Sequence, residues 1–164
     1  MPVLDVGRQA PDFTLRTVDG TTFSLKEALA EGPVVLAFFK ISCPICQYAF
    51  PYLDRLHRAL KGSGVTVIGV SQDGPNETRS FMREFGVTFK VAIDDESNHF
   101  AVSNAYGLTN VPTVVEIAPD GTIESAIVGW SRDEVVQIYT RHARADSATP
   151  LYRPDEEIAA FRAG

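Results

Sequence analysis

The chain has 164 residues, a length typical of one domain. Apolar residues make up 45% and charged residues 22%, which is enough apolar material for a packed core. The net charge of −6 at pH 7 argues against nucleic acid as a partner, and no apolar run is long enough to cross a membrane. Without a visible signal peptide, the sequence as written predicts a cytoplasmic protein, or a periplasmic or extracytoplasmic one if an export signal was trimmed from it.

The first forty residues predict a hairpin, a short helix and a buried strand. Residues 11–15 alternate like a strand, and the Asp-Gly pair within residues 18–21 is typical of a hairpin turn. Ser24, with Glu27 three residues later, predicts a capping box at the start of a short helix. The apolar run Val34–Phe39 then predicts a strand that other elements cover on both faces.

The rest of the chain predicts alternating helices and strands. The expected elements are a helix at 44–60, a strand at 65–70, a helix at 75–85, a strand at 89–93, a helix at 98–106, a hairpin of strands at 114–118 and 121–128, and a helix at 131–143. This order predicts an α/β fold with a mixed sheet and helices on both faces. We interpret residues 1–144 as the domain and the polar residues 145–164 as a C-terminal tail with one short helix at 155–161.

Two cysteines, the only ones in the chain, stand where the buried strand meets the following helix. Cys43 and Cys46 are three positions apart. Because a strand leads directly into a helix here, Cys43 lies at the helix N-terminus, where free N–H groups and the helix dipole favour thiolate over thiol. A thiolate attacks disulfides, and a second thiol within one turn resolves the mixed disulfide. The histidines show no ligand spacing and none follows Cys46, which argues against zinc and covalent haem. The pair therefore predicts a redox site.

The element order and the segment Cys43-Pro44-Ile45-Cys46 resemble the thioredoxin superfamily, and within it the TlpA/ResA-like and AhpC/TSA-type redoxins. Further segments that resemble this family lie at 10–15, 50–53, 67–73, 106–113 and 119–121, so that the resemblance spans roughly residues 10–143. It implies a thioredoxin-like fold: a central mixed sheet flanked by helices, with an N-terminal β extension and an inserted helix–strand unit.

The resemblance also implies roles for individual residues. Cys43 would be the attacking thiolate and Cys46 the resolving thiol. Pro112 would follow a cis peptide bond and face the pair, Val111 would pair its backbone with an extended substrate, and Pro44 would belong to the same substrate-binding surface. The implied activity is thiol–disulfide exchange with disulfides of partner proteins and with an unknown redox partner. It needs neither an organic cofactor nor a metal.

Both acids that usually tune such a pair are absent. Their positions, six residues before and six after Cys43, hold Ala37 and Ala49. Glu116, in the middle of a neighbouring strand, is the candidate substitute proton acceptor for Cys46, because burial would raise its pKa. Alternatively, Glu116 points to the solvent end of the strand or pairs with Lys40. Lys40 either lowers the pKa of Cys43 through its charge or is a solvated residue at the end of the strand.

Two other functions stay open at this point. A peroxiredoxin-like thiol peroxidase would share the N-terminal strand and the insertion, but Phe39 and Cys43 stand where its pattern needs proline and threonine. A thiolate module that holds a soft ion such as Cu(I) would need only the two sulfurs, although no methionine or histidine lies close by in the sequence. Because a fold alone does not decide function, these alternatives must be separated by the chemistry of the site.

Overall fold

A five-stranded sheet in the order β5-β4-β3-β6-β7 forms the centre of the computed structural model, which describes residues 5–144 and 149–164. Its strands are β3 (Val34–Phe39), β4 (Thr66–Ser71), β5 (Lys90–Ile93), β6 (Thr113–Ile117) and β7 (Ile123–Val128). β3, β4 and β5 run parallel, whereas β6 and β7 are antiparallel to their neighbours. This mixed sheet confirms the predicted α/β fold.

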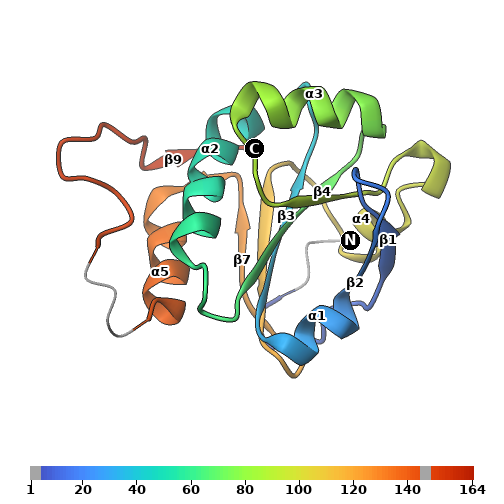
Figure 1. The fold of residues 1–164 in the computed structure, drawn as a ribbon, viewed down its shortest axis with the longest axis horizontal. Coiled ribbons are helices and arrows are strands. Elements are labelled where there is room, and N and C mark those ends of the chain that lie inside the picture. Colours follow the sequence, from blue (N-terminus) through green and yellow to red (C-terminus); the bar gives the residue numbers. More distant parts are fainter. Residues whose placement is uncertain (1–4, 145–148) are drawn as a thin grey trace.

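Helices cover both faces of the sheet, and two short strand pairs flank it. The helices are α1 (Leu25–Glu31), α2 (Pro44–Ala59), α3 (Pro75–Phe85), α4 (Ala101–Ala105), α5 (Arg132–His142) and a 3₁₀ turn at Glu96–Asn98. The short pairs are β1 (Thr14–Arg16) with β2 (Thr22–Ser24), and β8 (Trp130–Ser131) with β9 (Phe161–Arg162). In Figure 1, α2 and α5 lie on one side of the sheet and α1, α4 and β1 on the other. No helix in the described ranges is long and apolar enough to span a membrane.

β3 is fully buried and divides the core into two halves. All six of its residues are buried, as its apolar run predicts. Val35, Ala37 and Phe39 face the half formed with α2, α3 and α5, and the alternate residues face the half formed with β1 and α4. Because side chains alternate along a strand, one strand serves both halves and ends at a fixed position, from which the chain turns into α2.

Local chemistry explains where the helices begin. The Ser24 side chain accepts a hydrogen bond from the N–H of Glu27, which confirms the predicted cap of α1. The predicted helix at 98–106 is partly wrong, because His99 and Phe100 have positive φ angles of 53° and 51° and break it. The buried Asp94 carboxylate accepts N–H groups of the first turn of α4 and so fixes its later start.

The segment 149–164 packs against α2 and β8 in a largely extended form, and the predicted helix at 155–161 is wrong. The main chain of Ala159 donates to the Tyr48 hydroxyl (2.9 Å) and accepts from the indole N–H of Trp130 (2.7 Å). Since these backbone groups bind side chains of other elements, they are not available for helical hydrogen bonds. The division of the chain at residue 144 stays a prediction, and residues 145–148 lie outside the described part.

The first prediction concerns Asp54, a buried carboxylate on α2 that holds the loop before β5. It is 2% exposed and accepts hydrogen bonds from the N–H (2.6 Å) and the hydroxyl (2.8 Å) of Thr88. Asp54→Ala should lower the free energy of unfolding by about 2–3 kcal/mol, because it leaves these donors without an acceptor. Urea unfolding near neutral pH measures this. The exposed Asp155→Ala is the matched control, and an equal loss in both variants would contradict the prediction.

Candidate active site

Cys43 is the N-cap residue of α2, in the turn that follows β3. Its backbone is extended, and its sulfur accepts a hydrogen bond from the N–H of Cys46 at 3.1 Å. Pro44 lies in the first turn, where its missing N–H costs no helical hydrogen bond. The sulfur of Cys43 therefore lies at the positive end of the helix dipole, where negative charge on sulfur is stabilised.

The two cysteines are free thiols in very different surroundings. Cys43 is half-buried, whereas Cys46 is 0% exposed. Burial raises the pKa of the Cys46 thiol well above its ordinary value of 9.0, the Cys43 sulfur and the Asp73 charge raise it further, and the backbone of Lys40 opposes the shift. Cys43 is thus the accessible thiol, and Cys46 is an inner thiol that stays protonated.

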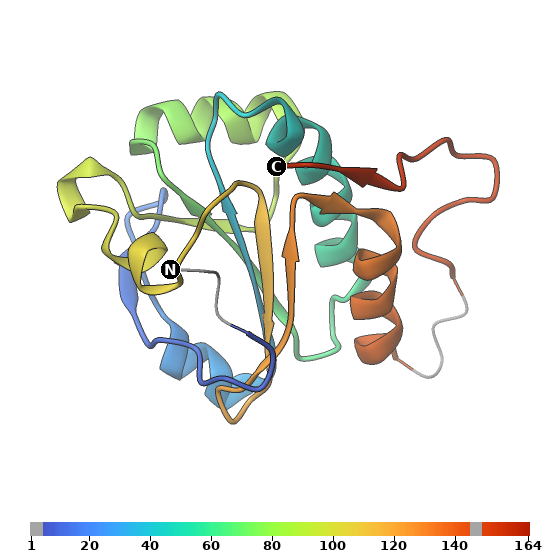
Figure 2. The ribbon, with the colours of Figure 1, turned by 180° about the vertical axis from the view of Figure 1, so that it is seen from behind.

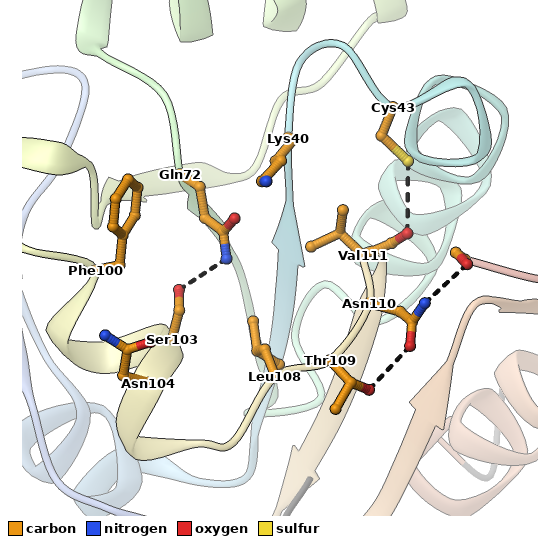
Figure 3. Close-up of a pocket in the computed structure, with 11 residues that line it drawn as sticks. Lys40, Cys43, Gln72, Phe100, Ser103, Asn104, Leu108, Thr109, Asn110 and Val111 are labelled. Carbon is orange, nitrogen blue, oxygen red and sulfur yellow. Dashed lines mark hydrogen bonds between the residues drawn. The ribbon is translucent and has the colours of Figure 1, made fainter. Parts of the chain in front are cut away.

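The loop before β6 faces Cys43. The Val111–Pro112 peptide bond is cis, as the family resemblance implies. The Cys43 thiol donates to the carbonyl oxygen of Val111 at 3.5 Å (Figure 3). The structure therefore brings together five of the seven predicted site residues, namely Cys43, Pro44, Cys46, Val111 and Pro112.

A pocket opens beside Cys43, between the end of β3, the end of β4 and the loop after α4 (Figure 3). Besides Cys43 and Val111, its lining residues are Lys40, Gln72, Phe100, Ser103, Asn104, Leu108, Thr109, Asn110 and Gly164. Lys40 is exposed. Among the lining residues that the structure describes, it is the one with a charged side chain. The sixth predicted residue, Lys40, therefore lies at the site, beside a mainly polar surface.

Glu116, the seventh predicted residue, lies elsewhere. It is buried on β6 opposite Val35, at the end of β3 that is far from Cys43. Its carboxylate accepts hydrogen bonds from the Ser125 hydroxyl (2.8 Å), from the Arg141 guanidinium (2.5 and 3.1 Å) and from Nε2 of the His142 ring (2.5 Å). Within the described chain none of its hydrogen bonds goes to Cys46 or Lys40.

The environment of Glu116 also corrects its expected acidity. Burial by itself would raise the pKa of Glu116, but the hydrogen bonds from Arg141, His142 and Ser125 outweigh burial and hold it below the ordinary value. The expected rise is wrong, as are the alternatives of a solvent-facing or Lys40-paired side chain. The only signal in the sequence was the pair of basic residues, Arg141 and His142, at the end of the predicted helix at 131–143.

Asp73 is a site neighbour that sequence reasoning missed. It follows β4, and its carboxylate accepts the N–H of Ile41 at 2.8 Å, which ties the end of β4 to the turn after β3. Its charge is one of those that raise the pKa of Cys46. Because parallel neighbouring strands end at the same edge of a sheet, the position of Asp73 just after β4 was the signal that could have found it.

Comparisons with known proteins agree with this geometry. The model of the AhpC/TSA family matches residues 6–126. The thiol-disulfide oxidoreductase ResA of Halalkalibacterium halodurans is 31% identical over 132 residues, which cover 80% of this chain and 73% of that protein.

Solved structures are similar over most of the chain. The thioredoxin domain of a thiol-disulfide oxidoreductase from Bacteroides vulgatus has a TM-score of 0.76 at 22% identity, over 86% of this chain and 99% of that one. DsbF from Mycobacterium tuberculosis has a TM-score of 0.67 at 28% identity, over 80% of this chain and 95% of that one. The first of these likenesses shows the thioredoxin-like fold.

Glu116→Gln tests the role of the buried carboxylate. The variant should lower the free energy of unfolding by about 1–3 kcal/mol, since it removes the charge that Arg141 and His142 face. The loss should be full above the ordinary carboxyl value of 4.5 and should shrink as the pH falls through the lower folded pKa, because wild type then loses the same charge. Chemical denaturation across pH measures this. A variant of unchanged stability but altered cysteine reactivity would instead support the proton-acceptor hypothesis.

Alkylation tests the contrast between the two thiols. When reduced protein meets iodoacetamide near neutral pH, Cys43 should react about tenfold or more faster than Cys46, because Cys46 is buried and protonated. Peptide mass mapping after timed quenching gives both rates. Cys46→Ser should keep the fast phase and Cys43→Ser should lose it, and equal labelling of both thiols in wild type would contradict the structure.

Proposed function

Because the chain belongs to the AhpC/TSA family and is a thiol–disulfide oxidoreductase, we propose that Cys43 attacks disulfides of partner proteins and that Cys46 resolves the product. The observation that carries this assignment is the contact of the Cys43 thiol with the Val111 carbonyl at the edge of an open pocket. A substrate sulfur that reaches Cys43 through this pocket lies beside the backbone of Val111, which supports pairing with an extended partner chain.

The exchange takes two steps. The Cys43 thiolate attacks one sulfur of the partner's disulfide, the S–S bond breaks, and the other partner sulfur leaves as a thiolate that takes up a proton. Cys46 then loses its proton and attacks the Cys43 sulfur, which releases the second partner sulfur. The partner gains two electrons and two protons, and the chain is left with a Cys43–Cys46 disulfide. A dithiol donor must reduce this disulfide before the next cycle.

The surroundings of Cys46 determine which step is slow. Burial keeps Cys46 protonated, and the hydrophobic residues at Ala37 and Ala49 offer it no base. Resolution of the mixed disulfide therefore waits for loss of a proton from an inner thiol, and its rate should rise with pH. The first step uses the half-buried but accessible sulfur of Cys43 and does not share this requirement.

The same burial argues against a peroxidase. Where the chain is compared with the peroxiredoxin pattern, Cys46 takes the peroxidatic position. Since Cys46 is 0% exposed and protonated, it offers peroxide neither access nor a thiolate. The geometry supports disulfide exchange at Cys43 instead.

Single-cysteine variants test the proposed mechanism. Reduced protein is mixed with insulin, whose disulfides serve as the protein substrate, and thiol transfer is followed. Cys43→Ser should lower the rate about a hundredfold or more, because the attacking sulfur is lost. Cys46→Ser should complete only the first step and accumulate a mixed disulfide, seen by mass spectrometry under non-reducing conditions.

The control and the contrary outcome use the same assay. Ser42→Ala, a change at the exposed neighbour of Cys43, should keep the wild-type rate. Rapid consumption of hydrogen peroxide that survives Cys43→Ser and disappears with Cys46→Ser would overturn the proposal in favour of a peroxidase.

A further inference from the structure

The last residues of the chain run beside the candidate active site. β9 (Phe161–Arg162) pairs antiparallel with β8, and the N–H of Arg132 donates to the carbonyl of Ala160 at 3.0 Å. Figure 2 shows this segment passing along β8 toward the beginning of α2. A segment that is far from Cys43 in sequence thus reaches the same edge of the molecule.

The end of this segment touches the residue that we assign to substrate pairing. The main-chain oxygen of Gly164 accepts from the side-chain amide of Asn110 at 3.0 Å (Figure 3). A Cβ added at Gly164 would lie 2.7 Å from the Val111 oxygen, and one added at Gly129 would collide with the Arg162 oxygen. Backbone therefore packs directly on backbone at Val111 and Gly129, and Gly164 forms part of the wall of the Cys43 pocket.

The preceding residues are firmly anchored. Tyr48 and Trp130 bind both main-chain groups of Ala159. Arg55 pairs with Glu156 at 2.7 Å and holds the pKa of that carboxyl at about 2. Residues 160–164, in contrast, are exposed. Residues 161–164 can therefore detach while the anchors stay in place, and in doing so the Arg162 guanidinium leaves the Tyr48 ring, whose centre lies 5.7 Å from it.

We propose that residues 161–164 are an intramolecular competitor of protein substrates, docked against the backbone of Gly129 and of Val111, the residue with which an extended partner chain pairs. The inference rests on the proposed function, because it takes Val111 as the place where a partner pairs. The segment contains no cysteine, so it occupies this surface without reacting. A protein substrate must displace it, whereas a small disulfide can reach Cys43 through the open pocket.

The competition can be measured with substrates of two sizes. Deletion of residues 162–164 should raise kcat/KM toward insulin by about three- to tenfold. In the variant every molecule presents a free surface, whereas in wild type only the fraction with a displaced segment can bind. The rate with bis(2-hydroxyethyl) disulfide should not change. Gly164→Val, whose side chain has no room against Val111, should act in the same direction with every anchor intact. Arg153→Ala, an exposed change in the same tail, is the control and should leave both rates unchanged.

Two further readouts make the outcome decisive. A synthetic peptide of residues 158–164 added to the deletion variant should restore the slow insulin rate, and a scrambled peptide should not. In the Cys46→Ser mixed disulfide with a peptide substrate, amides of residues 161–164 should lose protection from hydrogen exchange.

The failures of the two proposals are distinguishable. An insulin rate that falls or stays constant in both variants, with unchanged thermal unfolding, overturns the competitor role. A wild-type protein that exchanges disulfides with neither substrate would instead contradict the proposed function.

Discussion

One hydrogen bond organises the candidate site: the N–H of Cys46 donates to the sulfur of Cys43. The same sulfur thereby caps α2 and remains at the rim of the pocket. A serine or aspartate would satisfy the helix end equally well, but only a thiolate adds nucleophilic chemistry toward disulfides. Since the backbone of Cys46 supplies this N–H, the cap also holds the first sulfur beside the residue that carries the second. Structure and reactivity depend on one contact.

The elements around this contact give the two sulfurs opposite properties. β3 and β4 end together, and Asp73 ties their ends through the N–H of Ile41. The helix that begins there carries Cys46 straight into the apolar half-core, where its thiol is held protonated. Cys43 stays one turn behind, against the loop of Val111. A single turn of helix thus separates the accessible sulfur of Cys43 from the buried sulfur of Cys46.

Features that depend on neighbouring residues could be predicted from the residues themselves. The family resemblance supplied the Val111–Pro112 loop opposite Cys43, but other contacts between distant residues could not be predicted. The Ser24 cap, the burial of β3 and the place of Cys43 all follow from residues within one turn or one strand. Glu116 could not be placed, because its partners Arg141 and His142 lie on α5 and only the packing of α5 against the sheet brings them together. The path of residues 149–164 was missed for the same reason, since side chains of α2 and β8 hold its backbone.

The alternation of β3 has a consequence for how the length of this chain can change in evolution. Its odd-numbered residues face one half-core and its even-numbered residues the other. An insertion or deletion of one residue inside β3 would exchange the two sets and rotate the start of α2 away from the Val111 loop. The interval from Val34 to Cys43 therefore has to keep its number of residues for Cys43 to stay opposite Val111.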